Sequence, residues 1–219
     1  MTTSLRAGAA TGSPPSNLAP MNGVDRVLTY VVLGAMAVRL MSAARYSLSN
    51  QGRTTARRIV RRVRWRHLWP VPPVLAVVSL VAAALLRIPG LEWGWWTALG
   101  GQGNPVTGTT DRTAGTFWEW LIPLVFLTLV APALPLFALA EERMFRRGAE
   151  SWSRWRRLVK IVSFGLVHAV IGIPIGVAMA LSVGGAYFMW SYLRCYRSVG
   201  DSDEAMLESA TAHTTYNAV

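Results

Sequence analysis

Four apolar stretches, the last of them interrupted, dominate the chain; they cover residues 27–41, 69–88, 117–140 and 158–196. The stretch 69–88 is long enough for a helix to cross a bilayer. The stretch 27–41 is shorter and contains Arg39, so it either lies in the membrane interface or spans marginally. The stretch 117–140 contains three prolines, which predict kinks in its helix. The pattern predicts an all-α fold, a polytopic transmembrane helical bundle.

The last apolar stretch is interrupted by the sequence GIPIG at residues 172–176. This predicts a helix that ends near Ile171, a turn, and a second helix that begins at about Ile175. The C-terminal segment that follows has mixed polarity. Asp201 or Ser202 can cap its start and acidic residues fill its first turn, which predicts a further helix. Because polar groups facing lipid are costly, we expect this helix to be packed inside the bundle.

The N-terminal residues, 1–23, are rich in Thr, Ser, Gly and Pro, and this composition predicts a disordered tail. The tail does not have the form of a signal peptide, because it is long and only weakly basic before any apolar core. The chain of 219 residues is long enough for one compact domain and short for two. We therefore expect residues 24–219 to form one helical membrane domain.

The amino-acid composition indicates the environment in which these segments lie. The chain is 52% hydrophobic with a mean hydropathy of +0.32, yet its formal net charge is +11. A soluble basic protein would spread its charge over a polar surface, whereas here the charge lies in blocks between apolar segments, which indicates an integral membrane protein. Cys195 is the only cysteine, so an internal disulfide and a cysteine-based metal cluster are excluded, and we expect this side chain to pack.

The basic residues predict the topology, because they fall mainly in two segments, 53–66 and 143–160. The loop between the second and third apolar stretches is poor in basic residues and carries Trp93, Trp95 and Trp96. The positive-inside rule puts both basic segments in the cytoplasm and the tryptophans near the opposite interface. This predicts a multi-pass protein of the cell membrane whose partner is the lipid bilayer. Arginine runs would also fit nucleic-acid binding, but between membrane segments we expect no nucleic acid.

Charged side chains lie at the foot of the third apolar stretch. Glu141 and Glu142 are adjacent, and Arg146 follows Glu142 by four residues. A glutamate with an arginine four residues later is a favourable pair on a helix. By itself this pattern is typical of a charged helix end at the membrane boundary.

The chain has three histidines, and each has two interpretations. His67 ends the first basic segment and is most simply an interfacial polar residue. His168 lies in an apolar sequence, where it is either a core residue bonded to a carbonyl or a functional residue that needs a partner. His213 and Asn217 are four residues apart, so they share a helical face; the alternative is an ordinary polar pair near the C-terminus.

These polar residues together offer the parts of a hydrolytic site. A carboxylate can act as a base toward a bound water, and a histidine can transfer protons. A histidine and an asparagine on one helical face can donate hydrogen bonds to the oxyanion that forms when water attacks a carbonyl.

Three short motifs resemble those of the CPBP family, the CAAX proteases and bacteriocin-processing enzymes, also called the ABI family. The sequence EERMFR at 141–146 resembles the EExxxR motif, FGLVH at 164–168 resembles FxxxH, and HTTYN at 213–217 resembles HxxxN. The motifs occur in the family's order, and the resemblance covers residues 117–219. It implies a membrane helical bundle whose motifs meet in a cavity open toward the cytoplasm.

The resemblance also implies roles for the motif residues. Glu141 would activate the water, and His168 would help to hold it and to shuttle protons. His213 and Asn217 would form the oxyanion hole, and Arg146 would orient or neutralise the glutamates.

Two further residues, Glu142 and Phe164, would support these side chains. A glutamate and two histidines are able to ligate zinc, but no HExxH pair is present. The resemblance to the glutamate-dependent branch of the family favours a reaction without metal or other cofactor.

The sequence thus predicts an intramembrane endopeptidase that acts on a membrane-associated protein or lipidated peptide. One alternative is a non-catalytic membrane scaffold or bacteriocin-immunity protein of the same family. Another is a small transporter in which Glu141 and His168 relay protons.

Overall fold

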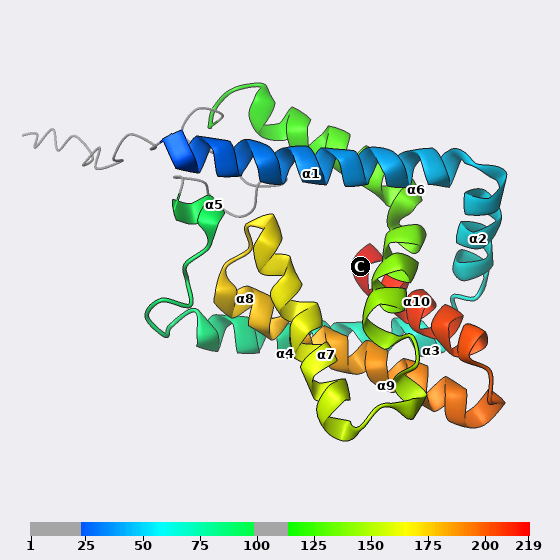
Figure 1. The fold of residues 1–219 in the computed structure, drawn as a ribbon. Helices are drawn as coiled ribbons and strands as arrows, with labels where there is room; N and C mark the ends of the chain where they lie inside the picture. Colours follow the sequence, from blue (N-terminus) through cyan, green and yellow to red (C-terminus); the bar gives the residue numbers. More distant parts are fainter. Residues whose placement is uncertain (1–22, 99–113) are drawn as a thin grey trace, which may run out of the picture.

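The computed structural model describes residues 23–98 and 114–219, and every regular element in these two ranges is a helix (Figure 1). The predicted tail therefore lies outside the described residues, except for Gly23, which begins the first helix. The α-helices are α1 Gly23–Leu48, α2 Asn50–Arg61, α3 Trp65–Leu68, α4 Val71–Leu85, α5 Trp95–Ala98, α6 Trp118–Arg146, α7 Arg154–Leu166, α8 Ile175–Ala180, α9 Ser182–Val199 and α10 Ser202–Ala218. Two short 3-10 helices are η1 Ala149–Ser151 and η2 Val167–Ile171.

Two helical segments in the described ranges are long and apolar enough to cross a membrane. They are Trp65–Leu85, formed by α3 and α4, and Ile175–Val199, formed by α8 and α9. A third candidate is a bent segment that comprises α6 and η1, with limbs Trp118–Thr128 and Val130–Ser151 at 58° to each other. The prediction of helices that are long and apolar enough to cross a membrane is confirmed for these segments, and α1, which holds the stretch 27–41, is not among them.

The bend in α6 has a local cause. Pro132 lies inside the helix, lacks a backbone N–H, and places its ring against the carbonyl of the residue four positions earlier, which is Thr128. The first limb ends at that residue. The kink predicted from the prolines is therefore confirmed.

The interruption near residue 172 is also observed, and Trp93 and Trp95 form hydrogen bonds with the residues around it. Gly172 ends η2 with a φ of 89°, a left-handed conformation that suits glycine. Beyond it, the backbone N–H of Ile175 donates to the carbonyl of Trp93 at 3.0 Å, and the Trp95 indole N–H donates to the carbonyl of Val170 at 3.0 Å. The loop after α4 and the first residue of α5 thus fix the point at which the chain enters α8.

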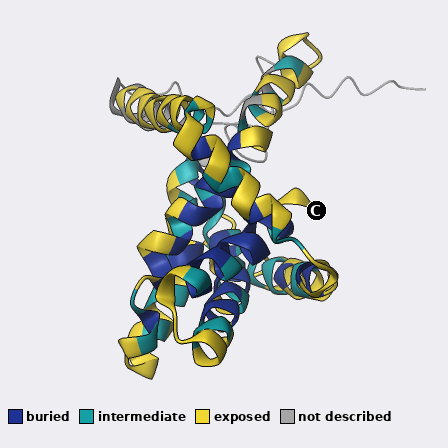
Figure 2. Cartoon of the chain, turned by 90° about the vertical axis from the view of Figure 1, so that its right-hand side faces the viewer, coloured by how far each residue is buried: buried dark blue, intermediate teal, exposed yellow. Residues whose placement is uncertain are grey.

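Helix α10 forms the centre of the fold, where it packs against α9 and α6, and Figure 2 shows buried residues concentrated in that region. Asp201 caps α10 by accepting hydrogen bonds from the N–H groups of Asp203 and Glu204. The hydroxyl groups of Thr211 and Thr214 donate to backbone carbonyls four residues earlier, both at 2.7 Å. These internal hydrogen bonds allow a polar helix to be buried, as the sequence predicted.

Candidate active site

The second limb of α6 carries a buried carboxylate, and three side chains surround it. Glu142 is fully buried. Arg146 Nη1 donates to Glu142 Oε1 at 2.8 Å, and His213 Nδ1 donates to the same oxygen at 2.9 Å. The Ser209 hydroxyl donates to Glu142 Oε2. A buried carboxylate is tolerated only when it is paired and hydrogen-bonded in this way, so Glu142 is the structural centre of the cluster.

Arg146 is as buried as the carboxylate that it pairs with. Its Nη2 donates to the carbonyl of Gly185 in α9 at 3.1 Å. Its guanidinium carbon lies 4.4 Å from the ring centroid of Phe164 and 5.4 Å from that of Phe188. The two aromatic faces and the carbonyl stabilise the cation away from water.

The orientation of His213 is fixed by two contacts. Its ring stacks on Phe188, with centroids 4.2 Å apart and an interplanar angle of 20°. Because the Glu142 carboxylate can only accept, the proton in their hydrogen bond is on His213 Nδ1. In the neutral ring, Nε2 is then an acceptor. The geometry therefore presents a lone pair at Nε2, on the side of the ring away from Glu142.

Glu141 lies opposite that lone pair. Its side chain is 34% exposed, and its Oε2 is 3.7 Å from His213 Nε2. This carboxylate oxygen is itself buried and has no hydrogen-bond partner within the described residues. Two acceptors at this separation are too far apart for a direct hydrogen bond, but they match a position that one water can bridge by donating to both.

His168 lies near the cluster without touching the glutamates. It is half-buried, and its Nδ1 donates to the backbone carbonyl of Phe164 at 2.8 Å. The Phe164 ring has edge contacts with both histidines, at centroid distances of 5.2 Å to His168 and 5.5 Å to His213. The hydrogen bond is the one expected for a core histidine bonded to a carbonyl, and the aromatic ring separates the two imidazoles.

Asn217 is not brought into the cluster. It is exposed near the end of α10, and its side chain makes no hydrogen bond to a described residue, whereas His213 on the same helix is buried. A spacing of four residues places the two on one helical face. The other helices cover α10 through Thr215, however, and leave Asn217 exposed. The expected oxyanion hole from His213 and Asn217 is therefore not formed by these two side chains.

The two glutamates differ in how many hydrogen bonds they make. Glu142, expected to be a supporting residue, makes the hydrogen bonds to Arg146 and His213. Ser209 was not identified from the sequence, although it precedes His213 by four residues and so shares its helical face. Phe188 was missed as well, because an aromatic residue in an apolar helix gives no signal of its own.

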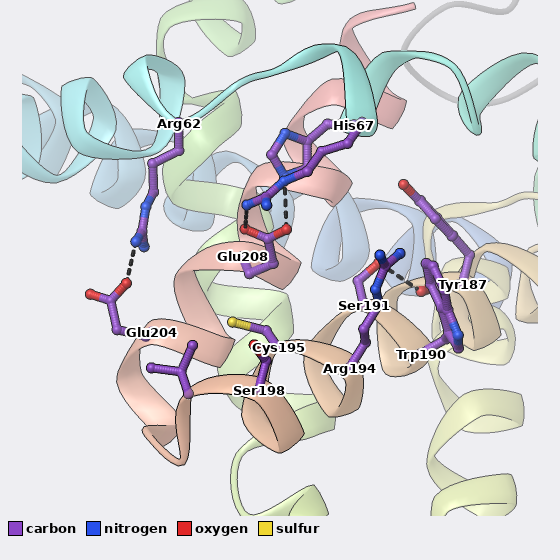
Figure 3. Close-up of a pocket in the computed structure, with 12 residues that line it drawn as sticks. Arg62, His67, Tyr187, Trp190, Ser191, Arg194, Cys195, Ser198, Glu204 and Glu208 are labelled. Atoms are coloured by element: carbon purple, nitrogen blue, oxygen red, sulfur yellow. Dashed lines mark hydrogen bonds and ion pairs between the residues drawn. The ribbon is translucent and has the colours of Figure 1, made fainter.

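A second polar cluster joins the N-terminal basic segment to α10, around a cavity of about 290 Å³ (Figure 3). Arg62 pairs with Glu204, while Arg66 Nη2 donates to Glu208 Oε2 at 2.9 Å. His67, expected to be an interfacial polar residue, is buried among the described residues. Its Nδ1 accepts from the backbone N–H of Arg64 at 3.0 Å, so its Nε2 donates to Glu208 Oε1, also at 3.0 Å.

These contacts set the ionisation of Glu208. Burial by itself would raise the pKa of this carboxyl group, but the hydrogen bond from His67 and the charge of Arg66 outweigh burial and hold the pKa below its usual value. Glu208 is thus a carboxylate that anchors α3 to α10.

Within residues 23–98 and 114–219, no group of three or more His, Cys, Asp or Glu side chains is arranged to hold a metal ion. No protein-family model, curated protein or solved structure matches the chain.

Proposed function

We propose that this chain is an intramembrane endopeptidase that hydrolyses peptide bonds of membrane-associated substrates through a water molecule activated by Glu141. The observation that carries the proposal is the pair of acceptors, Glu141 Oε2 and His213 Nε2, 3.7 Å apart. A water that donates one hydrogen to each would present its oxygen lone pairs to a substrate carbonyl. Glu142 supports this arrangement because its hydrogen bond orients the His213 ring.

The reaction balances with these residues and one water. The water oxygen forms a bond with the carbonyl carbon of the peptide while Glu141 takes a proton from the water. The tetrahedral intermediate then breaks its C–N bond as that proton is delivered to the amide nitrogen, directly or through His213. The products are a carboxyl terminus and an amine.

Arg146, Glu142 and Ser209 act in the proposal as positioning residues. The Glu142–Arg146 pair is internally neutral and keeps the imidazole of His213 aimed at Glu141. His168 has only an indirect part in the proposal, because it contacts the Phe164 ring and not the glutamates.

The class of substrate follows from the environment of the cluster. Glu141 and Glu142 lie in the second limb of α6, which belongs to the bent candidate membrane segment. Arg143 and Arg146 lie in the last turn of α6, directly after the glutamates, so the positive-inside rule favours the cytoplasmic side of the cell membrane for this end of the helix. Substrates would be proteins or lipidated peptides at that membrane surface, as the motif resemblance to the CPBP family implies.

The test uses purified protein in lipid vesicles with a library of membrane-anchored, fluorescence-quenched peptides in ¹⁸O-labelled water. The wild-type protein should cleave members of the library and place ¹⁸O in the new carboxyl termini. Glu141→Gln keeps the shape of the side chain but removes the base, and should reduce the rate by about 10²–10⁴-fold. Glu92→Gln, an exposed loop residue, is the matched control and should cleave as the wild type does. Equal rates for Glu141→Gln and the wild type would refute the role of Glu141.

A non-catalytic scaffold or bacteriocin-immunity protein is the second candidate. The observation that favours it is that the Glu142 carboxylate is already fully hydrogen-bonded within the protein. Its carboxylate has three donors and no exposed surface, which is typical of a buried structural pair. In this case Glu141→Gln should leave protection of cells against bacteriocin unchanged, whereas Arg146→Met, which disrupts the core, should abolish it.

A further inference from the structure

A groove of about 360 Å³ runs between α7 and α9, away from the glutamate cluster. Its lining is almost wholly apolar along most of its length. The main apolar residues are Leu158, Ile161, Met189, Trp190 and Leu193. They follow helical spacing on each helix, so one face of α7 and one face of α9 form the two walls.

The walls converge at one end. A Cβ on Gly185 would lie 2.9 Å from Phe164 and 3.1 Å from the carbonyl of Ile161, so the two backbones are in close contact there. From this contact the groove follows α7 toward its start and α9 toward its end. Its other end is therefore formed by residues near the beginning of α7 and the end of α9.

Three arginines line that other end: Arg154, Arg157 and Arg197. Arg157 is held in place, because its Nε donates to the carbonyl of Ala149 at 2.9 Å and its Nη2 to that of Glu150 at 3.1 Å. Arg154 and Arg197 are exposed, and neither side chain pairs with another residue of the described ranges. The described lining includes no acidic side chain, so the groove pairs an apolar channel with a positive mouth.

The mouth lies where a membrane interface is expected. Arg197 is in the last turn of Ile175–Val199, a segment long and apolar enough to cross a membrane. Trp155 at the start of α7 is 72% exposed, and tryptophan is enriched at membrane interfaces. Further along α7, Val159 and Val162 are exposed apolar residues suited to lipid tails.

We propose that this groove binds an anionic glycerophospholipid, with an acyl chain along the apolar walls and the headgroup phosphate at Arg154, Arg157 and Arg197. The charge of the mouth selects an anionic headgroup over a zwitterionic one. The apolar length of the groove selects a lipid over free phosphate, which would leave those walls without a partner. The site is separate from the proposed hydrolytic cluster and does not depend on it.

Trp190 provides a direct probe, because it lines the groove. The full-length protein is reconstituted in phosphatidylcholine vesicles that contain a minor fraction of either dibrominated phosphatidylglycerol or dibrominated phosphatidylcholine. Bromine on the acyl chain quenches nearby indole fluorescence, and subtraction of a Trp190→Phe variant isolates the signal of this residue. We expect quenching at a lower fraction of brominated phosphatidylglycerol than of brominated phosphatidylcholine.

The double variant R154A/R197A should reduce this preference by roughly five- to thirtyfold, since each arginine near an anionic headgroup contributes about fivefold. The matched control R57A/R61A removes two exposed arginines of α2, outside the groove, and should keep the preference. Equal quenching by both lipids would overturn the headgroup assignment. Loss of the preference in the control would show that the preference comes from the overall surface charge and not from the groove, and would overturn the site. Displacement of the brominated lipid by inorganic phosphate would show a phosphate site instead. Glu141→Gln should bind lipid as the wild type does, so failure of the hydrolase proposal leaves this test intact.

Discussion

Replacing Arg146 by methionine removes the cation that compensates the buried Glu142. The pair is 2.8 Å apart, with side chains 1% and 0% exposed, so water cannot take the place of the arginine. Removing one partner of a buried ion pair costs about 3–5 kcal/mol, because the remaining charge stays buried without compensation. We expect Arg146→Met, and separately Glu142→Leu, to lower the free energy of unfolding by that amount.

The double variant distinguishes pairing from simple packing. Glu142→Leu/Arg146→Met removes both charges and leaves only neutral groups without partners, chiefly the His213 Nδ1–H and the carbonyl of Gly185. Such groups cost about 1–3 kcal/mol each. Ser209 is spared, because its hydroxyl also lies 2.9 Å from the carbonyl of Phe188. The double variant should therefore be about as stable as either single variant.

The measurement is reversible unfolding in mixed micelles by titration with sodium dodecyl sulfate, followed by circular dichroism. Arg143→Met makes the same change at an exposed position of α6 and should alter the free energy of unfolding by less than about 0.5 kcal/mol. Additive losses in the double variant, within about 0.5 kcal/mol, would show that Glu142 and Arg146 stabilise the fold independently, and would refute the pairing.

Two further predictions concern acid stability and helix packing. The pKa of Glu208 is lowered in the folded state, so its contribution to stability is complete above the unfolded pKa of about 4.3 and is lost as the pH falls through the folded value. Glu208→Gln should flatten the acid side of a plot of unfolding free energy against pH, and an unchanged acid side would contradict this. Gly185→Ala would put a Cβ 2.9 Å from Phe164 and should lower the unfolding free energy in mixed micelles by about 1–3 kcal/mol. Its control, Gly34→Ala in α1, meets open space and should be neutral or slightly stabilising, so equal losses in both would exclude the packing explanation.

The local features of this fold could be predicted from neighbouring residues alone. The bend in α6 follows from Pro132, the turn at Gly172 from its glycine, and the start of α10 from Asp201. The pair between Glu142 and Arg146 likewise follows from their spacing on one helix. Each depends on backbone geometry within one or two turns, which the sequence specifies directly.

The assembly of the candidate site depends on contacts between distant segments. Which glutamate is buried is decided by the packing of α10 on α6, since Ser209 and His213 reach Glu142 from 67 and 71 residues away. Asn217 has the spacing of a site residue, yet it extends beyond the part of α10 that other helices cover.

The sequence by itself determined that the chain is helical and has segments long and apolar enough to cross a membrane. It also determined where the helices break and which polar residues lie among apolar ones. These properties follow from hydrophobicity and from backbone preferences that act over a few residues. Only the tertiary structure decided that Ser209 and His213 also hold Glu142, while Oε2 of Glu141 has no hydrogen bond within the described residues. Burial is a property of how helices pack, and two adjacent glutamates point about 100° apart, so a small difference in helix rotation exchanges their environments.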